Sequence, residues 1–177
     1  MGSSEGAEAS ATGLEQRIRA LEDRALIVEA IVRYANSLDS CDYVEMRSLL
    51  LDDVHMDFAF MGLEPQTFKA DDWVGYARHA LSGLKCTHHI SPNHVLERLE
   101  GDEATCISYM YAQHWLPNDR GGDEFLMRGH YSNELRRTPS GWKIAGMKQV
   151  TTWTSGNASL FSLAMGATEP GVTPRTR

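Results

Sequence analysis

The sequence predicts an α+β fold, because helical periodicity comes first in the chain and strand alternation with short turns follows it. From Leu14 to Leu38, apolar residues recur at spacings of three and four, which is typical of amphipathic helix. From Val54 to Phe60, residues of one face are apolar at every second position, as in a strand. Helices that precede an antiparallel sheet cover one of its faces. We therefore expect N-terminal helices packed on a curved antiparallel sheet.

Aspartates indicate where the helices begin. Asp23 is a candidate cap for the second part of the first helical segment. Asp42 can satisfy free backbone N–H groups at the start of a short helix that we expect to end at Leu51. A third helix is expected from Asp71, a candidate N-cap, to Gly83, a residue type that often ends helices.

Four strands are expected after the third helix, joined by turn sequences. The segments 100–102 and 139–141 contain the Gly, Asp and Ser residues that favour tight turns. Pro92 has no N–H to donate to a ladder, so it indicates an edge or a bulge in the first of these strands. The expected strands run over residues 86–99, 104–116, 125–137 and 142–153.

Length and composition favour one ordinary globular domain. The chain has 177 residues, of which 42% are hydrophobic and 23% are charged. Its net charge is −7 and its basic residues are scattered, which argues against a nucleic-acid partner. No apolar run is long enough to predict a membrane span. Three cysteines without a C-x-x-C pair fit a reducing compartment, so we expect a cytoplasmic protein.

The expected domain covers residues 14–156 and has a tail at each end. Residues 1–13 are rich in Gly, Ser, Ala and Glu and lack the features of a secretion signal, so we expect a disordered tail. Residues 157–177 contain two prolines and one apolar patch. We expect this second tail to lie across a pocket mouth or a neighbouring subunit. The patch comprises Leu160, Phe161, Leu163 and Met165.

Histidines on the expected strands are candidates for general acid–base catalysis, because imidazole titrates near neutral pH. If the first two long strands both turn a histidine inward, His88 and His114 enter the same cavity and His89 points outward. Periodicity alone leaves the inward face open, because Tyr109, Tyr111, Gln113 and Trp115 form an equally plausible lining. An ordinary hydrogen-bonded or exposed histidine is the alternative at each position.

Asp39 follows the apolar face of the first long helix and is the candidate partner for a histidine. It is either a plain helix-end residue or a buried carboxylate, and a buried carboxylate needs a partner. An Asp–His pair orients the imidazole and stabilises the imidazolium that forms on proton abstraction. Tyr34, about one turn earlier, can offer an O–H group to a carbonyl oxygen in the same cavity.

Motifs for other chemistry are missing from the sequence. The histidines and cysteines between Cys86 and His94 lack the usual zinc spacings, so no metal site is expected. There is no nucleophile elbow, phosphate-binding glycine loop or dinucleotide fingerprint, so no organic cofactor is expected either.

Three segments resemble the SnoaL-like branch of the nuclear transport factor 2-like superfamily, and within it the dehydratases and dehydrochlorinases. They are ALIVEAIVRYANSLDSCDYVEMRSLLLDDVHMDF, LKCTHHISPNHVLERLEGDEATCISYMYAQHW and RGHYSNELRRTPSGWKIAGMKQVTTWTSG. The resemblance implies a cone-shaped α+β barrel with a closed pocket. It places the family's catalytic aspartate and histidine on Asp39 and His88, a second histidine on His114, and a tyrosine on Tyr34. Leu38 and Phe58 stand where scytalone dehydratase keeps tyrosines, which argues against scytalone as the substrate.

The resemblance implies a cofactor-independent dehydratase or isomerase that acts on a hydrophobic, polycyclic or polyketide-like carbonyl compound. His88 would abstract a proton, Asp39 would polarise His88, Tyr34 would hold the oxyanion, and His114 would protonate or bind the departing hydroxyl. A cyclase or epoxide-opening enzyme and a non-catalytic binding module are the alternatives on the same fold. A homo-oligomer is also implied, a trimer or else a dimer. The expected substrate-binding residues are Met56, Phe58, Tyr111, Trp115, Phe125, Lys148 and Trp153.

Overall fold

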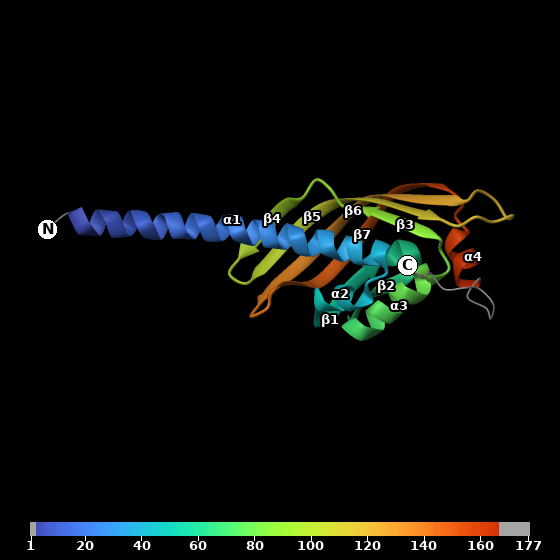
Figure 1. The fold of residues 1–177 in the computed structure, drawn as a ribbon, viewed down its shortest axis with the longest axis horizontal. Helices are drawn as coiled ribbons and strands as arrows, with labels where there is room; N and C mark the ends of the chain where they lie inside the picture. The colour runs from blue at the N-terminus through green and yellow to red at the C-terminus, as the bar shows by residue number, and fades with distance from the viewer. Residues whose placement is uncertain (1–2, 167–177) are drawn as a thin grey trace.

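The computed structural model describes residues 3–166, with side chains from Gly13 onward (Figure 1). Two helices open the chain, α1 (Ser3–Ser40) and α2 (Tyr43–Ser48). α1 is continuous, so the expected break and cap at Asp23 are wrong, and the helix includes most of the segment expected to be a loose tail. Alanine and glutamate are common in that segment and favour helix. The expected cap at Asp42 is confirmed, because its Oδ1 accepts the Glu45 N–H at 2.9 Å.

A seven-stranded curved sheet follows, and it is open rather than a closed barrel. The strand order is β2-β1-β7-β6-β5-β3, and β4 also pairs with β5. β1 and β7 run parallel, so the expectation of a wholly antiparallel sheet is wrong for this pair. The strands are β1 (Leu50–Phe58), β2 (Leu63–Lys69), β3 (Cys86–Ile90), β4 (Val95–Glu100), β5 (Glu103–Trp115), β6 (Glu124–Thr138) and β7 (Gly141–Gly156).

Strands β2, β3 and β4 depart from the expected element order. β2 was not expected, and it is joined to β1 by the short 3₁₀ helix η1 (Ala59–Met61) and Gly62, whose φ is +79°. The expected strand from Cys86 to Leu99 is divided into β3 and β4. Pro92 cannot donate to a ladder, and Asn93 has a φ of +56°, which turns the chain between the two strands.

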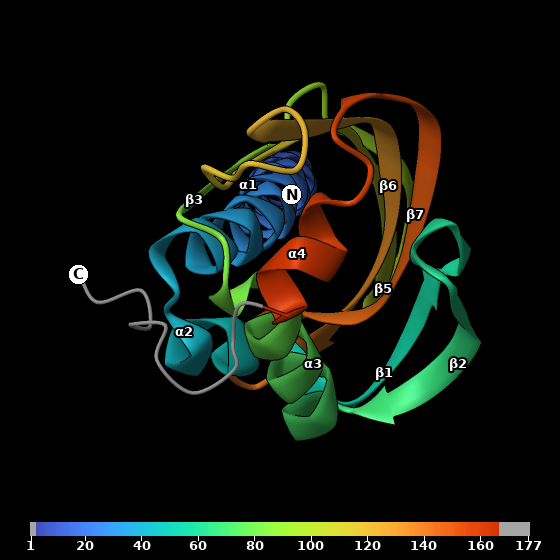
Figure 2. The same ribbon diagram turned by 90° about the vertical axis from the view of Figure 1, so that its right-hand side faces the viewer.

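Helices α1, α3 (Ala70–Ser82) and α4 (Leu160–Gly166) lie within the curve of the sheet (Figure 2). α3 begins at Ala70, so Asp71 is not its N-cap and instead accepts a hydrogen bond from Arg47 Nε at 2.9 Å. α4 belongs to the fold, because Leu160 and Ala164 are fully buried against α3 and the sheet. The segment beyond Gly166, part of the expected C-terminal tail, lies outside the described residues.

Asp23 attaches the middle of α1 to the β6–β7 hairpin next to its turn. Its carboxylate accepts hydrogen bonds from both terminal nitrogens of Arg137 and, at 3.1 Å, from Trp142 Nε1. Arg137 Nε also donates to Asp102 in the β4–β5 turn at 3.0 Å. The hydrogen bond from Arg137 holds the pKa of Asp23 below its usual value of 3.8, against the opposing effect of burial.

The contact between α3 and α4 predicts opposite effects for two glycine substitutions in and next to α3. A Cβ on Gly83 would lie 1.9 Å from the Ala164 carbonyl oxygen, whereas a Cβ on Gly75 would meet nothing within 4 Å. We expect Gly83→Ala to lower the free energy of unfolding by about 1–3 kcal/mol. Gly75→Ala should raise it by about 0.5–1 kcal/mol, because alanine favours helix. Urea unfolding measures both, and equal stability of the two variants would contradict this packing.

The Asp23 ion pair predicts a pH-dependent contribution to stability. At neutral pH, Asp23→Asn should cost about 1.5–3 kcal/mol, the range for hydrogen bonds to charged groups. Because folding lowers the pKa of Asp23, this contribution is complete above pH 3.8 and is lost as the pH falls through the folded-state value. The stability difference between wild type and variant, from denaturant unfolding, should therefore shrink below about pH 4. Asp119→Asn, at an exposed position, is the matched control and should change stability little at any pH.

Candidate functional site

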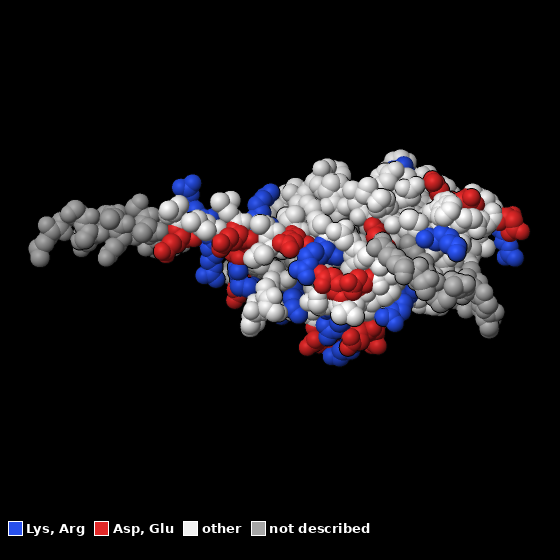
Figure 3. All heavy atoms as spheres, in the orientation of Figure 1, with Lys and Arg blue, Asp and Glu red and all other residues white. Residues whose placement is uncertain are grey.

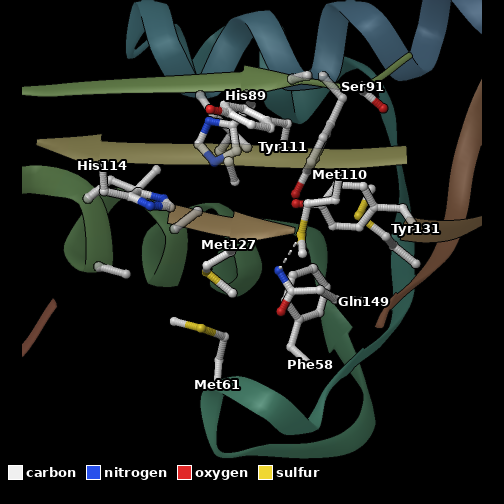
Figure 4. Close-up of a pocket in the computed structure, with 18 of the residues that line it drawn as sticks. Phe58, Met61, His89, Ser91, Met110, Tyr111, His114, Met127, Tyr131 and Gln149 are labelled. Carbon is white, nitrogen blue, oxygen red and sulfur yellow. Dashed lines mark hydrogen bonds between the residues drawn. The ribbon is translucent and has the colours of Figure 1, made fainter. Parts of the chain in front are cut away.

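A cavity of about 100 Å³ lies between the helices and the concave face of the sheet (Figure 4). Its wall is mostly apolar, formed by side chains of α1, α3, α4 and the central strands. A minority of polar side chains faces this apolar space, which is the usual composition of a small-molecule site. The polar lining residues include Tyr34, His89, Ser91, His114, Tyr131, Asn133 and Gln149.

The Asp39 carboxylate, at the end of α1, is bound to β3 by three hydrogen bonds. Its Oδ1 accepts from Thr87 Oγ1 at 2.9 Å and from His89 Nδ1 at 2.7 Å, and its Oδ2 accepts from the His89 backbone N–H at 2.8 Å. β3 is an edge strand, and the outward N–H groups of an edge need partners outside the sheet. The carboxylate supplies one and thereby attaches α1 to this edge.

The Asp39–His89 pair is largely shielded from water, with side-chain exposures of 17% and 10%. Burial would raise the pKa of Asp39, but the hydrogen bonds and attraction from His89 and the bond from Thr87 lower it below 3.8. A carboxylate only accepts hydrogen bonds, so His89 Nδ1 carries the hydrogen. In the neutral ring Nε2 is then the basic nitrogen. Asp39 thus selects the tautomer in which His89 can remove a proton.

The expected pairing of Asp39 with His88 is wrong by one residue. In the β3–β5 ladder, Thr87 lies opposite His114 and His89 opposite Ala112, whereas His88 lies opposite Gln113. Directly opposed residues share a face of the sheet, so Thr87 and His89 face inward with His114. His88 faces outward, into a groove between the end of α1 and β3.

His114 lies on the inward face of β5, which is one of the two strand orientations that periodicity left open. The buried inward positions of this strand are Ala104, Cys106, Ser108, Met110, Ala112 and His114. The His114 ring lies 5.4 Å from the His89 ring and 4.6 Å from Phe161 of α4. Its Nδ1 is 3.2 Å from the Phe125 carbonyl oxygen, which only accepts, so Nδ1 carries a hydrogen. The two histidines therefore present their rings to the same cavity.

Two buried tyrosines also face the cavity. The Tyr34 hydroxyl accepts a hydrogen bond from Trp73 Nε1 at 2.8 Å, which leaves its own hydrogen for another acceptor. Burial raises the pKa of Tyr34, and it raises the pKa of Tyr131 to about 12. Gln149 opposes the shift of Tyr131, while the negative charge of Asp39 adds to it. Both tyrosines are therefore neutral O–H groups at physiological pH.

Two amide oxygens on the cavity wall are buried without a hydrogen-bond partner within residues 3–166, Asn133 Oδ1 and Gln149 Oε1. The Asn133 amide nitrogen donates to the Cys106 carbonyl at 3.0 Å and to Ser108 Oγ at 3.2 Å, which fixes the orientation of the amide. The Gln149 nitrogen is 3.4 Å from Met110 Sδ. Figure 4 shows Gln149 and Tyr131 on the side of the cavity away from His114. A buried acceptor without a partner is costly, so this side suits a ligand that donates hydrogen bonds.

The expected substrate-binding residues are only partly brought together. Phe58 and Tyr111 line the cavity. Met56 is fully buried in the core behind it, and Phe125 packs against His114 without reaching the lining. Three others lie elsewhere. Trp115 is exposed, Lys148 Nζ is 3.1 Å from Asp57 Oδ2, and the Trp153 ring lies under the Arg128 guanidinium at 3.8 Å.

Sequence reasoning missed several polar lining residues, including His89, Tyr131, Asn133 and Gln149. His89 was assigned to the outer face by a strand parity that only the ladder register decides. The other three lie on β6 and β7, which carry polar residues on both faces, so alternation did not distinguish them. A search for polar residues at inward positions, made after one register was known, would have found them.

Among the residues whose placement the structure describes, no group of three or more His, Cys, Asp or Glu side chains is arranged to hold a metal ion. Within the same part of the chain, no helix is both long enough and apolar enough to cross a membrane.

The chain resembles several solved structures over about four fifths of its length. The Kfla4162 protein of Kribbella flavida is 32% identical with a TM-score of 0.76, covering 81% of this chain and 99% of that one. A putative scytalone dehydratase of Novosphingobium aromaticivorans is 20% identical with a TM-score of 0.69, covering 78% and 89%. A type 2 hexachlorocyclohexane dehydrochlorinase (LinA) is also 20% identical at 0.69, covering 80% and 93%. A search of curated proteins found no match.

The profile of the SnoaL-like domain matches residues 19–148, a segment that runs from the middle of α1 into β7. This segment contains Asp39, His89 and His114, and it accounts for most of the cavity wall. The chain therefore belongs to the SnoaL-like domain family and has the nuclear transport factor 2-like fold.

Proposed function

We propose that this protein is a lyase or isomerase that removes a proton adjacent to the carbonyl group of a hydrophobic, ring-containing substrate. The observation that carries the proposal is the 2.7 Å bond between Asp39 and His89 Nδ1 on the wall of an apolar cavity. An imidazole held by a carboxylate in this way acts as a general base through Nε2. The similarity to proteins described as a dehydratase and a dehydrochlorinase, both elimination enzymes, supports the same class of reaction.

In the proposed elimination, His89 Nε2 takes the proton from the carbon next to the carbonyl. The electron pair of the broken C–H bond is first delocalised onto the carbonyl oxygen as an enolate. When the carbonyl re-forms, this pair makes the new C=C bond, and the C–O bond breaks with its electrons leaving on the hydroxyl oxygen. His114 in its imidazolium form gives that hydroxyl a proton, so the leaving group is water. Asp39 stabilises the imidazolium formed on His89, and Tyr34 donates a hydrogen bond to the developing oxyanion. Without a leaving group, the same base and acid would move a double bond.

The substrate is expected to carry a hydrogen-bond donor at the end remote from His114. Asn133 Oδ1 and Gln149 Oε1 are acceptors in an otherwise apolar wall. A hydroxyl group placed there would satisfy one or both, while an apolar group would leave them unpaired. The proposed substrate class is therefore a hydroxylated ring ketone, with its carbonyl side toward the histidines and a hydroxyl toward Gln149.

Replacing each of two neighbouring histidines in turn tests which of them is the general base. We expect His89→Gln to reduce kcat by about 10²–10⁴-fold, the usual contribution of a general base. His88→Gln, the matched control on the outward face, should keep full activity. The assay is conversion of a panel of β-hydroxy ring ketones to enones, followed by absorbance and by loss of water in the mass spectrum. Equal turnover by the two variants, both folded by circular dichroism, would remove His89 from the mechanism. Binding without turnover of any compound would favour a binding module.

Gln149→Met tests the polar end of the cavity. We expect binding of a ring ketone with a remote hydroxyl to weaken about tenfold, the effect of one neutral hydrogen bond of about 1.4 kcal/mol. The analogue without that hydroxyl should bind the variant as well as it binds wild type, or better. Gln113→Met, on the outward face of β5, is the control and should change neither affinity. Calorimetric titration measures both ligands against wild type and the two variants, and parallel losses of affinity for both ligands in Gln149→Met would contradict the proposed hydroxyl contact.

A further inference from the structure

The N-terminal part of α1 extends well beyond the sheet (Figure 1). It carries large apolar side chains. Leu14, Ile18 and Leu21 precede the Asp23 attachment point and are 56%, 46% and 68% exposed. Exposed apolar side chains in one row on a helix indicate an interaction surface more often than isolated ones do. None of these three residues belongs to the face through which α1 packs on its own sheet. That face is formed by Ile27, Ala30, Ile31 and Tyr34.

The exposed row continues along α1 with the spacing of a coiled coil. Its members are separated alternately by four and three residues, which is the a and d pattern of a heptad repeat. Ala25 and Val32 are exposed and Val28 is half-buried, so the row remains accessible beside the domain. We call these six residues the α1 seam. They are Leu14, Ile18, Leu21, Ala25, Val28 and Val32.

The charges that flank the α1 seam are segregated by sign. Glu15, Glu22 and Glu29 occupy the e positions on one side, and Arg17 and Arg24 occupy the g positions on the other. All five are exposed. Figure 3 shows charged groups of both signs on the projecting helix, and the segregation concerns only the e and g positions beside the seam. Among the side chains of residues 13–166, Glu29 lies 4.0 Å from Arg33, and the other four form no ion pair.

This segregation specifies both a partner and a direction. In a parallel pair of identical helices, a g residue faces the e residue of the next heptad on the other helix, so Arg17 would face Glu22 and Arg24 would face Glu29. In an antiparallel pair, like charges would face each other and repel. The flanks of the α1 seam are thus complementary to a second copy of the same helix in parallel register.

We propose that two copies of this chain associate through a parallel coiled coil formed by their α1 seams. The core-facing side of α1 stays on its own sheet, because different residues form the two surfaces. Association removes Leu14, Ile18 and Leu21 from water, and the flanking charges select the parallel register.

Disruption of the seam is the first test. Sedimentation equilibrium over a wide dilution series of the full chain should show reversible association of wild type. Ile18→Glu/Leu21→Glu should weaken that association at least about 100-fold, which corresponds to about 2.8 kcal/mol. Leu26→Glu, at an exposed leucine of the same helix outside the seam, is the control and should associate like wild type. A wild type that is monomeric throughout, or an oligomer whose mass the seam variant leaves unchanged, would overturn the proposal.

Charge exchange and cross-linking test the partner and the direction. Arg17→Glu/Arg24→Glu should abolish association, and adding Glu22→Arg/Glu29→Arg should restore it. In a parallel pair, Leu21→Cys places two identical positions opposite each other, so mild oxidation should give a covalent dimer. Wild type, which has Cys41, Cys86 and Cys106, is the control for native thiols. The parallel seam is refuted if Leu21→Cys associates but does not cross-link, or if Arg17→Glu/Arg24→Glu associates as strongly as wild type. Monomers that bind anionic vesicles through α1 also refute it.

Discussion

The Asp39 carboxylate is the interaction on which both the fold and the site depend. It joins the end of α1 to edge strand β3 by accepting hydrogen bonds from the Thr87 hydroxyl and from the ring Nδ1 and backbone N–H of His89. The same contacts close one side of the cavity and fix the imidazole in the tautomer of a base. A buried carboxylate is costly unless it is fully hydrogen-bonded, and here the bonds that compensate it are also those that orient the catalytic candidate.

The open, curved sheet explains why one apolar cavity contains two distinct polar ends. Each inward strand position is surrounded by α1, α3 or α4, so a polar residue there must find a partner inside the protein or in a ligand. Asp39 provides that partner for His89, and Trp73 provides one for Tyr34. Asn133 and Gln149 each keep an oxygen unpaired within the described residues. In the proposed function, His89 and Tyr34 perform the chemistry, and Asn133 and Gln149 recognise the substrate.

Most elements could be predicted from the sequence, because their signals are local. Alternation located β5, β6 and β7 to within a few residues, and Asp42 caps α2 as its position suggests. The incorrect predictions share one physical cause, which is contact between segments that are distant in the sequence. Asp23 has the composition of a cap, yet its carboxylate is used by Arg137 and Trp142, more than a hundred positions away in the chain. β2 has weak alternation and is specified by pairing with β1.

The sequence by itself determined the fold class, the general position of Asp39 at a helix end, and the presence of histidines on strands. Only the tertiary structure decided which histidine Asp39 meets. His88 and His89 are adjacent and have the same chemistry, and side-chain direction reverses at every residue of a strand. The choice therefore depends on the register of β3 against β5, which is set by contacts between distant segments. Local sequence contains no information about that register, so the Asp–His pair was recognised in kind but displaced by one residue.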